Sequence, residues 1–498
     1  MTDEEQHNYK SISTHMAKGA IWMVAMRWCL KAIGLVQTII IARLLTPDDF
    51  GIVAMALIIF AFLEIMSNVN VDMILIRNKN AAKEDYDSAW TIKVLTGLGV
   101  TVMLMILAPF LSTYFNDDRV VAVVQIVSLR AGILGFENIG VVDFRKNLDF
   151  SREFRYWVFR RITLFVFSLS LVFILRNYYA IAISLPVSAA ITVGISFVMS
   201  PYRPTFCFTK IKEIGAFSAW LLCFNFTQFL SNRADEFIIG GVSNATTMGS
   251  YHVASDLAML PTREVVLPMV RALDPTFSKI AHDGAELRKA FCGVFNYIAI
   301  LCASVSIGMF VVAEDLVITL LGDQWYSAIP FFKWLALYGG LEGFVLTTAS
   351  FFVVLHRQKL MAFLGLVRIS VLIPVLIAVG HWFDVETIAM ARTSVMAFHV
   401  VLIYVFIFRI SSVVLGDVLS AIWRPLIAAL IMAWTISQLH NPDYESHYAS
   451  LAQDVSIGLV VFPAVLLALW FIAGRPDGAE KTTLKVGWEQ ASRRLLKR

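Results

Sequence analysis

Apolar runs of about 20 residues, the length that spans the hydrocarbon core of a bilayer as a helix, recur from one end of the sequence to the other. Lipid offers no water to the backbone, so each run must satisfy its own peptide groups, as an α-helix does. Hydrophobic residues make up 58% of the 498 residues and charged residues only 16%, which excludes an ordinary soluble protein. The sequence therefore predicts an all-α polytopic membrane protein.

Short polar breaks divide the apolar sequence into about fourteen transmembrane helices. Their expected bounds are 20–44, 51–70, 90–113, 120–142, 160–177, 179–200, 215–242, 249–271, 290–313, 328–355, 360–381, 386–409, 424–439 and 449–473.

Lys and Arg are concentrated in alternate loops, and this pattern predicts the orientation of the chain. The basic loops are 77–83, 145–155, 203–212, 279–288 and 357–359, whereas the loops between them are short and acidic or neutral. Basic loops stay in the cytoplasm, so we expect both termini there. The N-terminus starts with acidic residues and has no small-residue cleavage site, so the first helix is expected to serve as an uncleaved insertion signal.

The first span carries two cations on an otherwise apolar helix. Arg27 and Lys31 lie four residues apart, and Gly34 and Thr38 continue the same face. A charged face is costly against lipid and usually borders a water-filled cavity or a partner. Two like charges one turn apart repel each other, so they cannot neutralise one another. We therefore interpret Arg27 and Lys31 as functional residues.

The seventh span carries a polar face of its own. Asn225, Gln228, Asn232 and Asp235 follow helical spacing, and Arg233 lies beside them. Such side chains are expected to face other protein groups or water inside the membrane.

The eighth span is also amphipathic. Asp256 and Arg263 share one face, and Arg271 follows at the end of the span. Pro261 and Pro268 interrupt the backbone hydrogen bonds and free carbonyl groups, which only a wet or protein-lined environment tolerates. We therefore expect a broken helix that borders a solvated region.

An internal repeat is suggested by residues that match at one offset. Gly51 and Gly249 are 198 positions apart, and so are Ile41 and Ile239. Repeats of this kind build transporters with two parallel lobes and a site between them. The expected parts are an N-lobe at 1–205, a C-lobe at 206–412, a terminal helix pair at 413–473 and a basic cytoplasmic tail at 474–498 on the inner leaflet.

Several of these charges have other interpretations. Arg263 beside Glu264, and Arg233 near Asp235, are equally compatible with structural ion pairs between helices. The cations nearest the ends of their spans are expected to reach the interface by snorkelling, namely Lys93, Lys333 and Arg392. The membrane carboxylates are candidates for carrying a coupling ion, namely Glu64, Asp235 and Asp256.

The sequence lacks the motifs of several other function classes. There is no GxxxxGK[ST] phosphate-binding loop, which excludes an ATP-driven pump, and no HExxH or GxSxG hydrolase motif. The five cysteines show no paired ligand spacing. We therefore predict no catalytic residues, no metal, no cofactor and no nucleic-acid partner.

Three segments resemble the Wzx-type polysaccharide flippases of the multidrug/oligosaccharidyl-lipid/polysaccharide exporter superfamily, in particular the colanic-acid exporter branch. They are GLVQTIIIARLLTPDDFGIVAMALI (34–58), GSYHVASDLAMLPTREVVLPMVRALDPTFSKI (249–280) and LGDQWYSAIPFFKWLALYGGLEG (321–343). The resemblance covers nearly the whole chain. It implies a V-shaped pair of six-helix lobes related by a parallel pseudo-two-fold, followed by a terminal helix pair. The cavity between the lobes would be lined by spans one, two, seven and eight.

The resemblance also implies a function. The expected substrate is an undecaprenyl-diphosphate-linked oligosaccharide repeat unit, moved from the cytoplasmic to the periplasmic leaflet of the bacterial inner membrane by a monomer. A polysaccharide polymerase and chain-length proteins are implied partners. Five cations are expected to bind the diphosphate, namely Arg27, Lys31, Arg233, Arg263 and Arg271, and three amides to face the sugars, namely Asn225, Gln228 and Asn232. The alternatives are a cation-coupled drug exporter of the same superfamily and a membrane-embedded polymerase or ligase.

Overall fold

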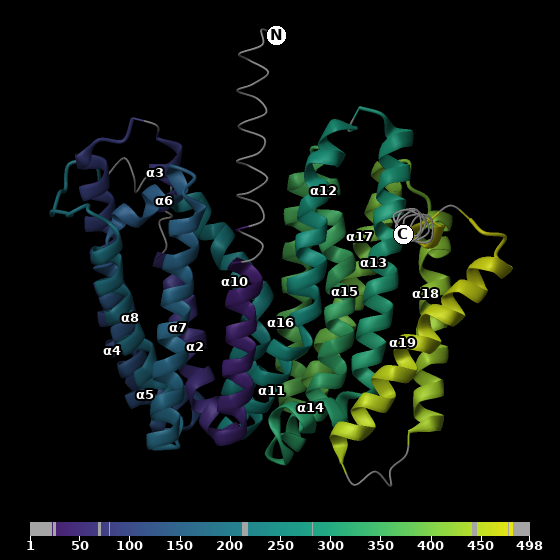
Figure 1. The fold of residues 1–498 in the computed structure, drawn as a ribbon, viewed down its shortest axis with the longest axis horizontal. Coiled ribbons are helices and arrows are strands. Elements are labelled where there is room, and N and C mark those ends of the chain that lie inside the picture. The colour runs from purple at the N-terminus through teal and green to yellow at the C-terminus, as the bar shows by residue number, and fades with distance from the viewer. Residues whose placement is uncertain are drawn as a thin grey trace, which may run out of the picture. The chain divides into compact units, whose positions relative to one another are not determined.

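The computed structural model describes residues 22, 26–67, 71–78, 80–211, 218–280, 282–440, 446–476 and 478–481. Side chains are outside this description at 218–225, 228, 272–276 and 278. Every regular element of the described residues is helical. The chain forms two compact units, Met1–Gly249 and Ser250–Arg498, and each is treated by itself below (Figure 1).

The first unit consists of a helix over 26–44 and the elements that follow it. These are α2 (Pro47–Ser67), α3 (Val71–Arg77), α4 (Lys83–Phe115), α5 (Arg119–Gly135), η1 (Ile139–Val141), α6 (Val142–Lys146), α7 (Phe150–Leu175), α8 (Tyr178–Met199), α10 (Ser218–Val242) and the start of α11 (Ala245–Ala258).

The second unit begins within α11 and continues to the C-terminus. Its elements are the π-helical turn η2 (Thr262–Val266), α12 (Leu267–Lys279), α13 (Gly284–Val311), α14 (Ala313–Leu321), η3 (Asp323–Ala328), α15 (Ile329–Val354), α16 (Gln358–Trp382), α17 (Glu386–Ile410), α18 (Leu415–Leu439) and α19 (His447–Ile472).

A helix overlaps each of the expected spans. Within the described residues, ten helices are long and apolar enough to cross a membrane, or eleven if the bent pair Arg119–Gly135 and Ile139–Lys146 is one span. This confirms a multi-pass, all-helical membrane protein, while the exact number of crossings and the two-lobe arrangement stay predictions. One expected span, 120–142, is not straight, because the chain bends by 70° between these two helices.

Several spans begin earlier than their apolar residues suggest, and at two of them polar side chains cap the start of the helix. Before Pro47, the hydroxyl of Thr46 donates to Asp49 Oδ2 at 2.7 Å and the Thr46 amide to the same oxygen at 3.0 Å. At the start of α18, Asp417 accepts from the Val414 amide at 3.0 Å and pairs with Arg288 at 2.7 Å. These caps move the starts to 47 and 415.

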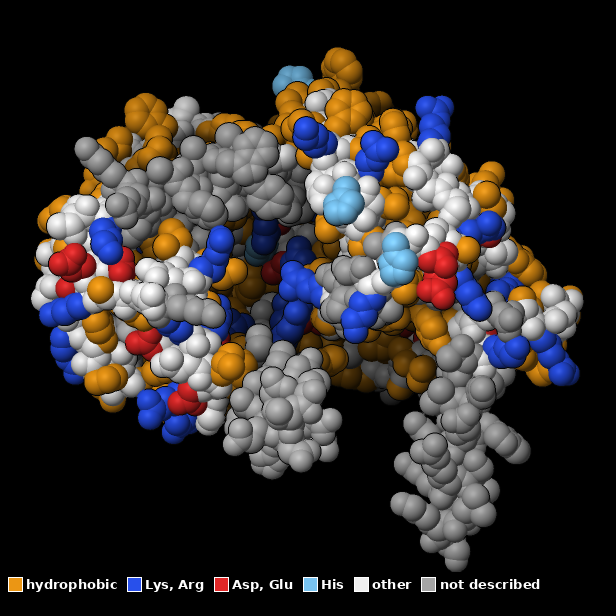
Figure 2. Space-filling view, turned by 90° about the horizontal axis from the view of Figure 1, so that it is seen from above, with side chains coloured by type: hydrophobic (Ala, Val, Ile, Leu, Met, Phe, Trp, Pro, Cys, Tyr) orange, Lys and Arg blue, Asp and Glu red, His pale blue; other side chains and the backbone are white. Residues whose placement is uncertain are grey.

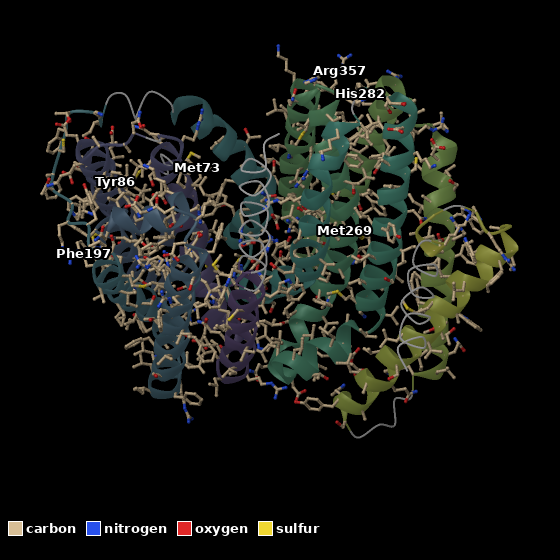
Figure 3. All side chains as sticks on the ribbon, turned by 45° about the horizontal axis from the view of Figure 1, so that its top comes forward. Met73, Tyr86, Phe197, Met269, His282 and Arg357 are labelled. Carbon is tan, nitrogen blue, oxygen red and sulfur yellow. The ribbon has the colours of Figure 1, made fainter. Side chains whose placement is uncertain are left out.

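The basic loops lie at one end of each unit. In the first unit α3 and α6 mark that end, and in the second His282 and Arg357 lie together beyond α12 and before α16 (Figures 1 and 3). Figure 2 looks down on these ends and shows many exposed Lys and Arg side chains, in blue, on each unit. This gathering is what the loop composition predicted for each unit.

Small residues let helices approach closely within the first unit. The α2 and α11 ends cross at Gly51 and Gly249: a Cβ on Gly51 would lie 2.5 Å from the Ala245 carbonyl carbon, and one on Gly249 would lie 2.8 Å from the Gly51 amide nitrogen. Both added atoms would also overlap a backbone oxygen, that of Ala245 and that of Pro47 respectively. The contacts are reciprocal at the offset of 198, so the segments that suggested a repeat meet as symmetric partners.

Residues 200–211, which include the expected boundary between the lobes at 205, run along α4 in the first unit. Asp87 accepts hydrogen bonds from the Tyr202 hydroxyl at 2.7 Å and the Thr205 amide at 2.9 Å, and Lys210 pairs with Asp85 at 2.6 Å. Burial beside the Asp87 carboxylate raises the pKa of Tyr202. The helix after this segment, α10, packs against α2 and α4 and also belongs to the first unit. The division into lobes at 205 stays a prediction.

The second unit is built around α15, which presents a glycine face to its neighbours. Gly339 lies under Thr262, whose hydroxyl donates to the Gly339 carbonyl at 2.7 Å, while Gly340 and Gly343 receive Ser306 and Cys302 of α13. Farther along, α13, α15 and α17 enclose aromatic rings, with Phe291 and Phe351 centred 4.5 Å apart. The contact between Thr262 and Gly339 holds η2 against α15.

Two residues of the expected basic tail, Ala479 and Glu480, are buried. Glu480 pairs with Arg424 at 2.7 Å, and their side chains are only 1% and 5% exposed. The Ala479 amide donates to Asn296 Oδ1 at 2.9 Å. Ala479 and Glu480 therefore pack inside the second unit, whereas Arg475 and Lys481 are exposed. Residues 482–498 lie outside the described residues, so the basic tail on the inner leaflet stays a prediction.

Candidate functional site

The helix over 26–44 packs one side against α7 and leaves the cations partly exposed. Gln37 Nε2 donates to Ser168 Oγ at 2.7 Å, and the Arg161 side chain lies directly over Gly34. Arg27 and Lys31 are half-buried and lie about two turns and one turn before Gly34. The predicted cationic face therefore belongs to a helix that is anchored to the rest of its unit.

A polar cavity of about 240 Å³ lies inside the first unit, between α2, α3, α4 and α5. Its walls carry Glu64, Ser67 and Asp72 on one side and Lys93 and Thr96 on the other. A pocket of this volume with several charged and polar side chains is large enough to hold water. The predicted ion-coupling residue Glu64 therefore lines this pocket, to which α5 contributes the apolar residues Ala131, Leu134 and Gly135.

Beside this cavity lies a buried ionic cluster centred on Glu137. The residue is 6% exposed and sits at the bend after α5. Its carboxylate accepts from Lys93 at 2.8 Å, from Arg160 at 3.5 Å and from the Tyr156 hydroxyl. The bend is held by Asn138, which accepts from the Gly140 amide at 2.9 Å and donates to the Tyr202 carbonyl at 2.7 Å. The bend thus places one carboxylate among donors of α4 and α7.

On α10 the structure separates the predicted polar residues. Asn232 is exposed, whereas Asp235 is fully buried. Arg233 forms an ion pair with the buried carboxylate of Glu236, one turn along the same helix. This pair lies within one helix, so it is not the interhelical pair that the sequence suggested for Arg233. The side chains of Asn225 and Gln228 lie outside the described residues.

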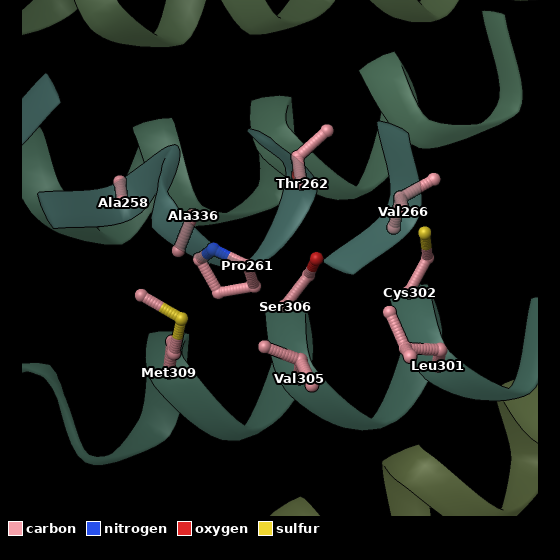
Figure 4. A pocket seen from close by; sticks show the side chains of 10 residues that line it. All are labelled: Ala258, Pro261, Thr262, Val266, Leu301, Cys302, Val305, Ser306, Met309 and Ala336. Carbon is pink, nitrogen blue, oxygen red and sulfur yellow. The ribbon is translucent and has the colours of Figure 1, made fainter. Parts of the chain in front are cut away.

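The eighth span is broken as its prolines predicted. After Pro261 the helix widens into a π-turn, in which the Leu267 amide donates to the Thr262 carbonyl five residues back. One side of the turn packs closely: Thr262 and Val266 face Cys302 and Ser306 of α13 across a void of only about 10 Å³ (Figure 4).

The opposite side of the broken helix is charged and exposed. Asp256 and Arg263 pair at 3.6 Å with side chains 50% and 43% exposed, and Arg271 is exposed as well. A pair this exposed adds little stability. Because charges facing acyl chains would be costly, this face requires water or another polar surface at its side.

Comparison with known proteins identifies the family. A family described as "Polysaccharide biosynthesis protein" matches residues 40–330, more than half of the chain. The chain belongs to this polysaccharide biosynthesis protein family. The resemblance to exporters of the Wzx type is thereby confirmed at the family level.

The chain is also similar to individual proteins and to a solved structure. The chain is 22% identical to an "uncharacterized membrane protein in cps region" of Klebsiella pneumoniae over 431 residues, which covers 85% of this chain and 88% of that protein. It is 21% identical to the lipopolysaccharide biosynthesis protein WzxC of Escherichia coli over 340 residues, covering 67% and 68%. The fold matches the inward closed conformation of the lipid II flippase MurJ with a TM-score of 0.71, at 12% identity, over 92% of this chain and 100% of that one.

In this member of the polysaccharide biosynthesis protein family, the prediction that Lys93 and Arg392 snorkel to the interface was wrong. Lys93 does not snorkel, because Glu137 holds it at 2.8 Å beside the cavity. Arg392 is 4% exposed, lies 4.2 Å from the centre of the Tyr338 ring and donates to the Tyr251 hydroxyl at 3.0 Å. Both find partners within their units, which sequence spacing alone could not show.

Proposed function

We propose that this protein flips a polyprenyl-diphosphate-linked oligosaccharide from the cytoplasmic to the periplasmic leaflet of the bacterial inner membrane. The observation that supports it most directly is the exposed charged face of the broken helix, with Asp256, Arg263 and Arg271 beside a π-turn. The half-buried Arg27 and Lys31 add cations at bilayer depth in the first unit. Membership in a polysaccharide biosynthesis family and the MurJ-like fold support the substrate class.

The chemistry of the substrate explains why such faces are needed. A diphosphate and many sugar hydroxyls would lose their hydrogen bonds in hydrocarbon, at a cost of several kcal/mol for each unsatisfied group. A hydrated path with cations removes most of that cost, and the guanidinium group binds two phosphate oxygens at once. The lipid tail would stay in the bilayer throughout. Transport would proceed by alternating access between two six-helix lobes.

In this proposal the residues have separate roles. Arg27 and Lys31 bind the diphosphate, with Arg233, Arg263 and Arg271 assisting as the headgroup moves. Three amides, Asn225, Gln228 and Asn232, contact sugar hydroxyls. Glu64, Asp235 and Asp256 are proposed to couple the cycle to a cation gradient, because a carboxylate at bilayer depth can exchange protons or bind a small cation.

Substitution of both Arg27 and Lys31 by alanine tests the diphosphate assignment in cells that depend on this gene for surface polysaccharide. Each lost charge-assisted hydrogen bond costs about 1.5–3 kcal/mol, so the double variant should make about tenfold less polymer or worse. The measurement is surface polymer per unit of membrane-inserted protein.

Two further variants sharpen this test. Arg27→Lys with Lys31→Arg keeps both charges and should retain much of the polymer, whereas Arg357→Ala removes an exposed loop cation and should change nothing. Normal polymer in the double alanine variant, at normal protein level, would exclude the two residues. A drug-resistance phenotype with unchanged polymer would instead favour a drug exporter.

A further inference from the structure

Four side chains from three helices gather where α14 begins and where α18 and α19 meet. The ligand-type atoms of Asp315, His440 and Asp454 all lie within 4.8 Å of one another. His447, the first residue of α19, adds its Nδ1 atom 2.7 Å from Asp315 Oδ1. None of these four residues is among those described above at the broken helix or in the pocket of the first unit.

The cluster is organised around His440 Nδ1. That atom lies 3.1 Å from Asp454 Oδ2 and 3.9 Å from Asp315 Oδ2. Ser450 donates a hydrogen bond to Asp315 Oδ2 at 2.6 Å, which fixes the carboxylate. Tetrahedral zinc ligands lie about 2 Å from the ion and hence about 3.3 Å apart. The three atoms lie within 4.8 Å of one another, so the carboxylates would have to move by up to about 1.5 Å to share one ion.

The two carboxylates are buried without enough positive charge around them. Asp315 and Asp454 are 6% and 2% exposed, and the second oxygen of Asp454 is buried with no hydrogen-bond partner among the residues that the structure describes. Two buried like charges this close are costly unless a cation lies between them. The histidines, by contrast, are nearly half exposed, which gives an ion a route from solvent.

From this geometry we propose that Asp315, His440 and Asp454 bind a divalent transition-metal ion, Zn²⁺ in the first place, and that His447, which contacts Asp315, supplies the fourth ligand. Two imidazoles and two carboxylates are a ligand set suited to zinc, whereas Mg²⁺ and Ca²⁺ prefer oxygen ligands alone. The sequence had predicted no metal, because its ligands are spread over 140 residues without paired spacing. The bound ion joins α14 to the α18–α19 hairpin, and by the loop charges it faces the periplasm.

The test uses the full-length protein, purified through a tag without histidine and stripped with a chelator. Titration with Zn²⁺ should raise Tm steadily with the logarithm of metal concentration once binding saturates, with one ion per chain by elemental analysis. Co²⁺ should bind in its place and give the intense visible absorption of a tetrahedral site. Equal stabilisation by Mg²⁺ or Ca²⁺ would overturn the transition-metal assignment, and so would the absence of saturable binding.

Variants separate metal binding from folding. Asp454→Asn should abolish the Tm rise with Zn²⁺, yet leave the metal-free protein as stable as the original or more so, because it removes one of two repelling charges. His440→Gln should weaken binding at least tenfold. His381→Gln, an exposed histidine at the end of α16, is the matched control and should titrate like the original. Unchanged zinc binding in Asp454→Asn would contradict the proposal.

Discussion

Replacing Gly51 by alanine should lower Tm, although alanine normally favours a helix over glycine by about 1 kcal/mol. The added Cβ would overlap the backbone oxygen of Ala245, and a backbone atom cannot turn aside as a side chain can. We expect a net loss of about 1–3 kcal/mol, the usual range for overpacking a tight contact. Gly249→Ala should behave alike, because its Cβ would meet the Pro47 carbonyl in the same way. Thermal unfolding of the purified protein measures both.

Gly99→Ala is the matched control for this prediction. Gly99 lies within a helix as Gly51 does, but a Cβ there has nothing within 4 Å. Its substitution should leave Tm unchanged or raise it. Ala245→Gly should not rescue Gly51→Ala, since the contacting atom belongs to the backbone. If Gly51→Ala and Gly99→Ala have the same Tm, the close crossing of α2 and α11 is not what requires glycine at position 51.

Removing the carboxylate of Glu137 should be the most damaging single change in the first unit. Glu137→Ala leaves Lys93 and Arg160 without the charge that balances them beside a bend in the chain. Breaking a buried ionic cluster by deleting one partner costs about 3–5 kcal/mol. We expect a strongly lowered Tm and reduced insertion of folded protein, read by the monodisperse fraction in size-exclusion chromatography.

A second substitution shows whether the charge is responsible. Glu137→Ala combined with Lys93→Ala should recover part of the loss, because the double variant no longer buries an unpaired ammonium group. Glu386→Ala, at an exposed carboxylate on α17, should stay within about 0.5 kcal/mol of the original. A Glu137→Ala protein as stable as this control would show that the cluster contributes nothing to the fold.

Much of the fold was predictable, because membrane-spanning helices need only local information. Apolar length located the spans, and Pro261 marked the break that the structure shows as a π-turn. Gly51 and Gly249, which match at the offset of 198, each lie against backbone atoms of the other's segment, where a Cβ would not fit.

What the sequence could not supply were contacts between distant segments. In the sequence, nothing distinguishes Glu137 from the other acidic residues of the spans. In the structure it forms ion pairs with Lys93, 44 residues away, and with Arg160. Asp315 and Asp454 looked like loop and span residues until α14 and α19 were packed together. Arg161 was not singled out, because nothing local shows that it lies over Gly34. Charges that find buried partners are recognised only once the packing is known.

Leaflet transfer in proteoliposomes is the most direct measurement of the proposed function. The purified protein is reconstituted with a fluorescent polyprenyl-diphosphate oligosaccharide, and the fraction in each leaflet is followed with a membrane-impermeant quencher. Our account predicts transfer that depends on the protein and slows about tenfold or more in the Arg27→Ala, Lys31→Ala variant. A proton or sodium gradient should accelerate it if Glu64, Asp235 or Asp256 couples the cycle. Transfer no faster than in empty liposomes, from protein that is folded and correctly inserted, would contradict it.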